Sequence, residues 1–206
     1  MRSDGELVEA WGRGDQEAAQ ELVDRYYRPV LRFFDVRVGA AAEDLTQRTF
    51  LGCVESRERL RKSESFRPFL FAIARGLLLN FLRSRKVESN VFETGDIGSA
   101  RDPGPTASRI VARHEEQVLL LRAIQTLDVD TQMLLVLFYW EGLKSAEIST
   151  VMGMGVSTIT TRMSRARKSL QETIETLPAV DGHRTSLLQN LEGWMQSLPS
   201  LDIATG

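Results

Sequence analysis

The chain has few of the residues that build disulfides and metal centres. It contains one cysteine, Cys53, and two histidines, His114 and His183. A single cysteine cannot form an internal disulfide, and one cysteine with two histidines cannot assemble a Cys/His zinc cluster. We therefore expect no disulfide framework, no metal and no cofactor. A cysteine in an apolar helix is more often a small buried residue than a nucleophile.

Long apolar runs and strand-like alternation are also missing. No stretch approaches the roughly 20 apolar residues that a bilayer span needs, and the acidic N-terminus lacks the apolar core of a signal peptide. The expectation is a cytoplasmic protein without membrane insertion. Apolar residues recur at helical spacing along most of the chain, without sustained period-two alternation. This pattern predicts an all-α fold.

The formal net charge of −2 conceals two basic segments. Between Arg57 and Lys86 there are nine basic residues and two acidic ones, and a second basic block lies between Arg162 and Lys168. Acidic residues instead gather in the first 24 positions. Separated basic segments are typical of nucleic-acid binding, although solvated helix faces give the same pattern.

Length and composition favour two small domains rather than one. The chain has 206 residues, and domains usually hold about 100 to 150. Helical periodicity stops between residues 87 and 109, where glycine, proline, serine and acidic residues gather, which predicts a flexible linker. We expect one helical domain at residues 1–86, a second at residues 110–177, and an extension at residues 178–206.

The extension carries an amphipathic pattern of its own. Its apolar residues share one helical stripe: Leu187, Leu188, Leu191, Trp194, Met195 and Leu198. A lone helix of this length is marginal in water, so the stripe requires a surface to cover. The alternatives stay open: the helix docks on its own second domain, it covers a face that binds DNA or polymerase, or it offers a site to a regulator.

The second domain contains the pattern of a helix-turn-helix. Such a motif needs a small residue where its helices cross, a glycine that accepts a positive φ in the turn, and inward-facing apolar residues. Ser149 and Gly153 supply the first two, and Ile148 and Ile159 are among the apolar positions. An ordinary helical hairpin would give a similar pattern. A helix from residue 156 would present small polar and basic side chains to a major groove.

The first domain mixes aromatic and basic residues between positions 61 and 86. Aromatic rings stack on unpaired bases while cations hold the backbone, so this mixture suits single-stranded DNA. Most of the phenylalanines are equally suited to the core, and periodicity does not say which one meets DNA.

Several ordered motifs together resemble the extracytoplasmic-function sigma factors of bacterial RNA polymerase. The segment DLTQRTF at residues 44–50 resembles the family's polymerase-binding region, and SFRPFLFAIARG with LRSRK at residues 65–86 resembles its −10 region. YWEGL at residues 139–143 and RMSRARK at residues 162–168 are similar to its −35-binding domain. The resemblance spans about residues 18 to 175, and the family likewise lacks the middle sigma domain.

The resemblance implies three sets of contact residues. The polymerase-binding set is Asp44, Leu45, Gln47 and Phe50, although Leu45 and Phe50 are equally suited to the core. The −10 DNA set is Arg61, Lys62, Phe66, Arg67, Phe69, Arg75, Asn80, Arg83 and Arg85. The −35 DNA set is Val156, Ser157, Thr158, Thr160, Thr161, Arg162, Arg165 and Lys168.

Some positions depart from the family's pattern. Arg48 stands where an acidic residue is usual, Gly76 replaces a common asparagine and Phe69 a common tryptophan. Gln132 and Thr160 take positions that are usually basic, which predicts a missing phosphate contact at each. We hypothesise that a phosphate on Thr46 would restore the acidity that Arg48 removes.

The function implied is that of a non-enzymatic sigma factor. It would bind core RNA polymerase and promoter DNA, duplex at −35 and single-stranded at −10, and help to melt the promoter. An anti-sigma factor or a Ser/Thr kinase are candidate regulators. The alternative is a stand-alone helix-turn-helix regulator of transcription, for which a polymerase-docking helix at residues 44–50 has no use.

Overall fold

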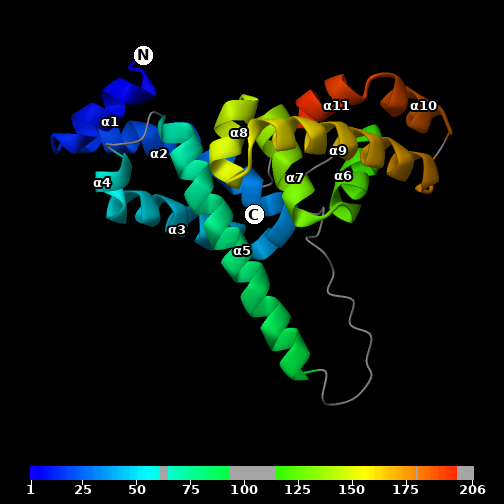
Figure 1. The fold of residues 1–206 in the computed structure, drawn as a ribbon, viewed down its shortest axis with the longest axis horizontal. Coiled ribbons are helices and arrows are strands. Elements are labelled where there is room, and N and C mark those ends of the chain that lie inside the picture. The colour runs from blue at the N-terminus through cyan, green and yellow to red at the C-terminus, as the bar shows by residue number, and fades with distance from the viewer. Residues whose placement is uncertain (61–64, 93–114, 180, 199–206) are drawn as a thin grey trace. The chain divides into compact units, whose positions relative to one another are not determined.

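A computed structural model of the chain describes residues 1–60, 65–92, 115–179 and 181–198. All regular structure in these ranges is helical, which confirms the all-α prediction. The chain divides into two compact units, one holding residues 1–104 and the other most of residues 105–206 (Figure 1). Among the described residues, no helix is both long enough and apolar enough to cross a membrane.

The first unit is built on three helices that pack on one another. They are α2 (Gln16–Val38), α3 (Ala42–Glu55) and α5 (Phe66–Phe92), and the short 3-10 turn η1 (Gly39–Ala41) joins the first two. The short helix α4 (Arg57–Leu60) follows α3. Apolar residues at helical spacing face inward, and Phe34, Phe71, Leu70 and Leu78 are at most 1% exposed. This packing fixes which faces of α3 and α5 remain open.

An N-terminal helix, α1 (Asp4–Gly12), packs across α2. Ser3 caps it: the Ser3 hydroxyl accepts from the Glu6 amide, and the Glu6 carboxylate accepts from the Ser3 amide at 2.7 Å. This reciprocal pair satisfies amides that the first turn leaves open. The sequence analysis did not identify this helix.

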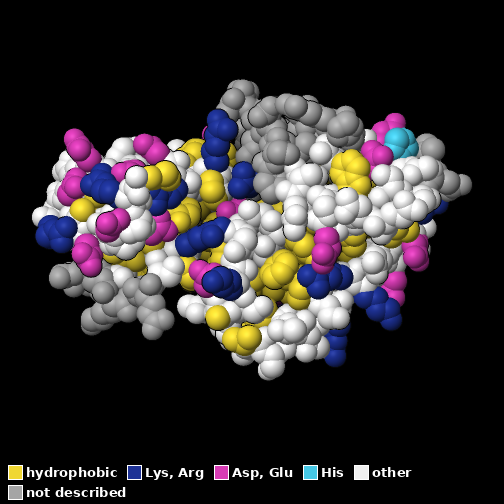
Figure 2. Space-filling model, turned by 90° about the horizontal axis from the view of Figure 1, so that it is seen from above, with side chains coloured by type: hydrophobic (Ala, Val, Ile, Leu, Met, Phe, Trp, Pro, Cys, Tyr) yellow, Lys and Arg dark blue, Asp and Glu magenta, His cyan; other side chains and the backbone are white. Residues whose placement is uncertain are grey.

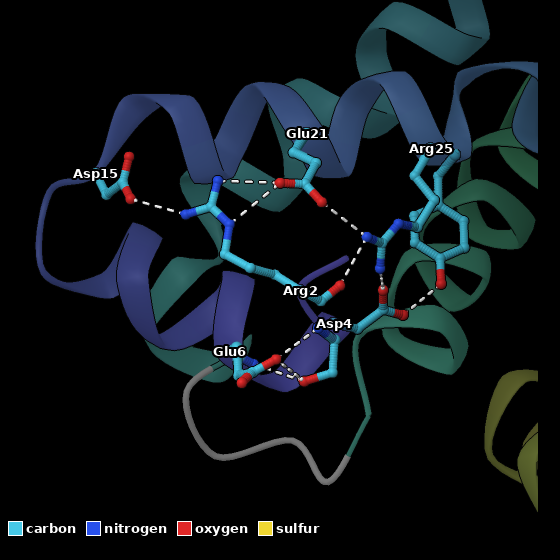
Figure 3. A network of polar contacts seen from close by, with 8 residues as sticks. Arg2, Asp4, Glu6, Asp15, Glu21 and Arg25 are labelled. Carbon is cyan, nitrogen blue, oxygen red and sulfur yellow. Dashed lines mark hydrogen bonds and ion pairs between the residues drawn. The ribbon is translucent and has the colours of Figure 1, made fainter.

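Ion pairs join α1 to α2 across their polar sides (Figure 3). Arg25 on α2 pairs with Asp4 and with Glu21, and Arg2 reaches Glu21 at 3.0 Å and Asp15 at 3.2 Å. Three of the acidic N-terminal residues, Asp4, Asp15 and Glu21, are therefore paired with arginines. Toward the left of Figure 2, over the first unit, acidic and basic side chains accordingly lie intermingled.

The second unit contains α6 (Glu115–Thr126), α7 (Val129–Leu135), a π-helical turn η2 (Val136–Trp140), α8 (Ser145–Met152) and α9 (Val156–Thr176). Asp128 caps α7 by accepting from the Thr131 amide at 3.0 Å. Helix α9 packs on α6 and α7 through Met163, Ala166 and Leu170, all at most 5% exposed. The bounds of α8 and α9 agree with the sequence pattern.

The extension forms two short helices where one was predicted, α10 (Asp181–Gln189) and α11 (Leu191–Ser197). Asn190 separates them, and its side chain accepts from the Gly193 amide at 3.2 Å, so it caps α11. Within the second unit α10 packs on α6 and α9, and α11 packs on α6 and η2 (Figure 1).

One boundary differs from the sequence prediction. Helix α5 continues to Phe92, although the linker was expected to begin at residue 87. No glycine or proline occurs between residues 87 and 92, so nothing in the sequence stops the helix there. The rest of the predicted linker, and the start of the helix expected from residue 110, lie outside the described residues.

Candidate nucleic-acid interface

The turn between α8 and α9 has the geometry of a helix-turn-helix. Gly153 adopts φ +66° and ψ 33°, the left-handed conformation that L-residues with a side chain disfavour. The Ser149 hydroxyl donates to the Met154 carbonyl at 2.5 Å, and the Met154 amide donates to the Ser149 carbonyl at 3.2 Å. Ile148 and Ile159 face the interior and are at most 1% exposed. The small residue and the glycine thus occupy the places that the motif requires.

Helix α9 presents the whole predicted −35 set to its surface. The exposed members are Val156, Ser157, Thr158, Thr160, Thr161, Arg162, Arg165 and Lys168. The hydroxyls of Thr160 and Thr161 donate to backbone carbonyls one turn earlier, at 3.1 and 3.0 Å. These threonines therefore keep their methyl groups and oxygen lone pairs available on the exposed side, which suits contacts in a major groove.

The basic residues of α9 differ in their surroundings. Arg162 lies 3.8 Å from Asp130 and Lys168 lies 3.8 Å from Glu172, both loose pairs between half-exposed or exposed groups. Exposed pairs of this kind are weak, so DNA phosphates would displace them readily. Arg167 instead turns toward the protein and packs on the rings of Phe138 and Tyr139.

Gln132 lies inside the second unit. It is 3% exposed, and its side-chain amide donates to the Leu127 carbonyl at 3.0 Å. Its role in this structure is to close the turn between α6 and α7. A missing phosphate contact at this position would therefore reflect burial as well as the change of residue type.

On α5, the members of the predicted −10 set have different environments. Asn80, Arg83 and Arg85 are exposed; Arg83 donates to the Asn80 side-chain oxygen at 3.3 Å. Arg67, Phe69 and Arg75 are half-buried. Arg61 and Lys62 lie outside the described residues. The exposed members form one polar and basic stretch toward the end of the apolar part of α5.

Phe66 is a core residue. It is 4% exposed and packs against the ring of Tyr26, with 5.3 Å between the ring centroids. Phe71 is fully buried and packs edge-on to Phe33. In this conformation Phe66 has almost no surface to offer a base. Among the aromatic residues of α5 whose side chains the structure describes, Phe69 and Phe81 are half-buried and retain accessible ring surface.

The residues of α3 divide into an inner and an outer face. Leu45, Thr46 and Thr49 are at most 3% exposed, whereas Asp44, Gln47, Arg48, Leu51 and Val54 are exposed. Leu45 therefore packs inside the first unit, and its contact with polymerase stays a prediction. Leu51 and Val54, at 60% and 57% exposed, are large apolar side chains open to solvent, and neither belongs to the predicted polymerase-binding set.

An open groove of about 380 Å³ borders this outer face. Its walls are mostly apolar and come from α1, α2, α3 and the first residue of α5, with Trp11, Tyr27 and Phe50 among them. The rings of Tyr27 and Phe50 stack, with their planes 12° apart and their centroids 6.5 Å apart. The outer face of α3, defined here as Asp44, Gln47, Arg48, Leu51 and Val54, therefore continues into an apolar groove.

Thr46 does not fit the phosphorylation hypothesis. It is 0% exposed, and its hydroxyl donates to the Ala42 carbonyl at 2.7 Å. A kinase cannot reach this hydroxyl while α3 is folded. Arg48 lies on the opposite, exposed side and pairs with Asp44 at 2.9 Å, so the two residues do not share a face with Thr46.

Two family models match the chain, one in each unit. Residues 19–87 match sigma-70 region 2, and residues 117–170 match sigma-70, region 4. The first match covers α2, α3 and α5, and the second ends within α9. Helix α1 and the extension with α10 and α11 lie outside both matches.

Curated relatives are RNA polymerase sigma factors. The chain is 31% identical over 134 residues to a probable RNA polymerase sigma factor, RfaY, of Xanthomonas campestris pv. campestris; the match spans 64% of this chain and 34% of that protein. It is 32% identical over 168 residues to the ECF sigma factor BldN of Streptomyces coelicolor, spanning 80% of this chain and 63% of BldN. It is 26% identical over 183 residues to the ECF sigma-E factor of Escherichia coli strain K12, spanning 85% of this chain and 96% of that factor. The chain thus spans about one third of the first relative and less than two thirds of the second.

Solved structures share the fold at low sequence identity. One is the sigma factor RpoE of Bartonella quintana, solved with the anti-sigma factor NepR: the TM-score is 0.60 at 20% identity, covering 77% of this chain and 98% of that one. Another is CnrH, solved with the cytosolic domain of CnrY, with a TM-score of 0.59 at 18% identity, covering 84% of this chain and 97% of that one.

Proposed function

Because this chain belongs to the extracytoplasmic-function sigma factors, we propose that it binds core RNA polymerase in the cytoplasm and directs it to specific promoters. The second unit binds the −35 element as duplex through α9. The first unit docks on polymerase through the outer face of α3 and holds unpaired −10 bases along α5. Catalysis belongs to the polymerase.

The observation that carries the proposal is the surface of α9. After the left-handed turn at Gly153, the exposed side chains of the predicted −35 set are small polar or basic, apart from Val156. Short side chains allow a helix to approach base edges closely, and the flanking arginines and lysine supply phosphate contacts. All eight positions lie outside the buried stripe of α9, so a bound duplex could reach each of them.

Docking through α3 is supported by the composition of its outer face. Exposed Leu51 and Val54 beside an apolar groove give a partner helix a surface to bury. Asp44 and Gln47 at the edge add polar contacts that fix orientation. Phe50 contributes from the groove wall, and Leu45 contributes only by holding α3 in place.

Promoter melting needs both units. Unstacking bases costs a few kcal/mol per step, which binding at the −35 element and to polymerase must offset. The exposed Asn80, Arg83 and Arg85, with the half-buried Phe69 and Phe81, are the described residues on α5 best suited to hold a single strand. We expect the isolated chain to bind promoter DNA weakly.

A protein regulator of the anti-sigma class fits the same surface. The Bartonella RpoE and CnrH structures each include a second protein, NepR or the CnrY cytosolic domain. By analogy, a regulator's apolar helix placed in the groove beside α3 would compete with polymerase. A Ser/Thr kinase remains a candidate only with a target other than Thr46.

The test combines the full chain with core RNA polymerase. Co-elution on gel filtration at micromolar concentration, followed by transcription from a library with randomised −35 and −10 segments, should yield one promoter consensus. Leu51→Arg should reduce co-elution, whereas Ala40→Arg, an equal charge change at an exposed residue before α3, should not. Sequence-specific binding to duplex DNA with no co-elution would instead identify a stand-alone helix-turn-helix regulator.

A further inference from the structure

The extension beyond the region 4 match is tied to the recognition helix. It begins after α9 ends at Thr176, and α10 and α11 fold back onto α9, α6 and η2 (Figure 1). Four of its leucines and methionines are at most 8% exposed: Leu187, Leu191, Met195 and Leu198. An apolar stripe buried to this extent makes the extension part of the second unit's core.

Arg167 connects α9 to the extension. Its Nε donates to the Tyr139 hydroxyl at 2.7 Å, and its terminal nitrogen lies 3.3 Å from the Glu192 carboxylate on α11. The guanidinium lies 5.6 Å from the ring centroids of both Phe138 and Tyr139. Arg167 is thereby held by groups from η2 on one side and from α11 on the other.

A second tie joins η2 directly to α11. The Trp140 indole nitrogen donates to the Met195 carbonyl at 3.0 Å. The Tyr139 hydroxyl, which is the acceptor for Arg167, also lies 3.5 Å from the same Glu192 oxygen. The network therefore spans three elements, and removing Glu192 would leave Arg167 with only its contacts to η2.

None of these contacts covers the predicted DNA surface. Every residue of the −35 set on α9 stays exposed with the extension docked. Arg167 stands one position before Lys168 and two after Arg165. The network therefore contacts the same turns that carry the basic residues, through a half-exposed arginine on the side of α9 that faces α11. The extension can thus fix the orientation of α9 without competing with DNA.

From this arrangement we infer that the extension positions the recognition helix, with Glu192 acting on −35 binding through Arg167. Glu192 and Trp140 are positioning residues, because neither lies on the predicted DNA surface. The inference rests on the proposed role of α9 in −35 recognition. The extension, which lies outside the family match, thereby takes part in promoter binding.

One substitution distinguishes positioning from a purely electrostatic effect, because the two predict opposite changes in DNA affinity. Glu192→Gln removes a negative charge near a helix that binds a polyanion, so a purely electrostatic effect would strengthen DNA binding. Positioning predicts the opposite: holoenzyme affinity for its selected promoter falls by about two- to fivefold, the size expected for an exposed ion pair. Glu175→Gln, the same charge change at an exposed residue of α9, is the matched control and should not weaken binding.

A second variant loosens α11 without changing charge. Asn190→Ala removes the side chain that caps α11 and should weaken binding in the same direction as Glu192→Gln. Both variants should also lower the ratio of affinities for the selected −35 element and a −35 mismatch. The slope of binding against salt should stay unchanged, since no phosphate contact is lost.

Hydrogen exchange on the full chain tests the inference without DNA. Amides of α9 around Arg167 should exchange faster in Glu192→Gln and Asn190→Ala than in Glu175→Gln. If exchange in α9 is unchanged, or if Glu192→Gln binds the promoter equally or more tightly, the inference is wrong. If the wild-type holoenzyme shows no −35 preference, the proposed function fails, while faster exchange in α9 would still establish that the extension holds this helix.

Discussion

Truncating two leucines on α3 should separate stability from partner binding. Leu45 and Leu51 are six residues apart on one helix, but Leu45 is 3% exposed and Leu51 is 60% exposed. Leu45 was predicted to bind polymerase on the strength of the family resemblance. Its burial means that Leu45→Ala acts by leaving a cavity between α3 and the helices on which it packs.

The two magnitudes differ enough to be measured. Replacing a buried leucine by alanine costs about 2 to 5 kcal/mol of unfolding free energy. For a domain of this size, each kcal/mol lowers the melting temperature by about 4 to 8 °C, so Leu45→Ala should lower the first unit's transition by at least about 8 °C. Leu51→Ala removes surface that is already in water and should change stability by less than about 0.5 kcal/mol.

For binding to core polymerase we expect the opposite result: Leu51→Ala is impaired and Leu45→Ala is not. With the fold intact, Leu51→Ala should weaken the complex by about 1 kcal/mol or more, roughly fivefold, if the outer face of α3 lies within the interface. Leu45→Ala should bind normally at a temperature where its first unit is folded. Thermal unfolding with hydrogen exchange on α2 and α3, and titration of labelled polymerase, measure the two effects. A Leu45→Ala protein that melts like wild type yet fails to bind would refute this division of α3.

Three further outcomes are expected. The carboxylates of Glu116 and Glu115 raise the pKa of His183, so the protonated imidazole stabilises the docked α10 below the unfolded pKa of 6.5, and this stabilisation is lost as pH rises through the folded pKa. His183→Gln should therefore lower the second unit's stability at pH 5.5 and leave it unchanged at pH 9. Equal effects at both pH values would exclude this linkage. Burial raises the pKa of the Cys53 thiol to about 12, so iodoacetamide at pH 8 should modify the folded chain about a hundredfold or more slowly than free cysteine, and rapid labelling without unfolding would show that the thiol is accessible. Gly153→Ala should destabilise the second unit by about 1 kcal/mol because of its positive φ, and a melting temperature equal to wild type would mean that the turn adopts another conformation.

Local signals in the sequence were sufficient to place the helix-turn-helix. Gly153 ends α8 and the residues after it restart the helical period at Val156, so both bounds could be predicted from neighbouring residues alone. Helix α1 was missed although its signal is local: Ser3 and Glu6 have the spacing of a capping box, which the structure contains.

Contacts between distant residues could not be predicted in this way. Arg167 and Glu192 meet across 25 positions because α11 folds back, and nothing near either residue specifies the partner. The same holds for Phe66, whose neighbour Tyr26 lies on another helix. A run of aromatic and basic residues indicates a DNA-binding region, but burial decides which aromatic residues can take part.

The ion pair between Arg48 and Asp44 changes how the outer face of α3 is understood. From the sequence, a basic residue at position 48 suggested a face short of negative charge that a phosphate would restore. In the structure Arg48 lies 2.9 Å from the Asp44 carboxylate, one turn away, and both are well exposed. The positive charge of Arg48 and the negative charge of Asp44 offset each other, so the exposed apolar side chains of Leu51 and Val54 are the distinctive features of the face. A partner that binds here therefore gains mainly from burying apolar surface, which a phosphate at the inaccessible Thr46 would not improve.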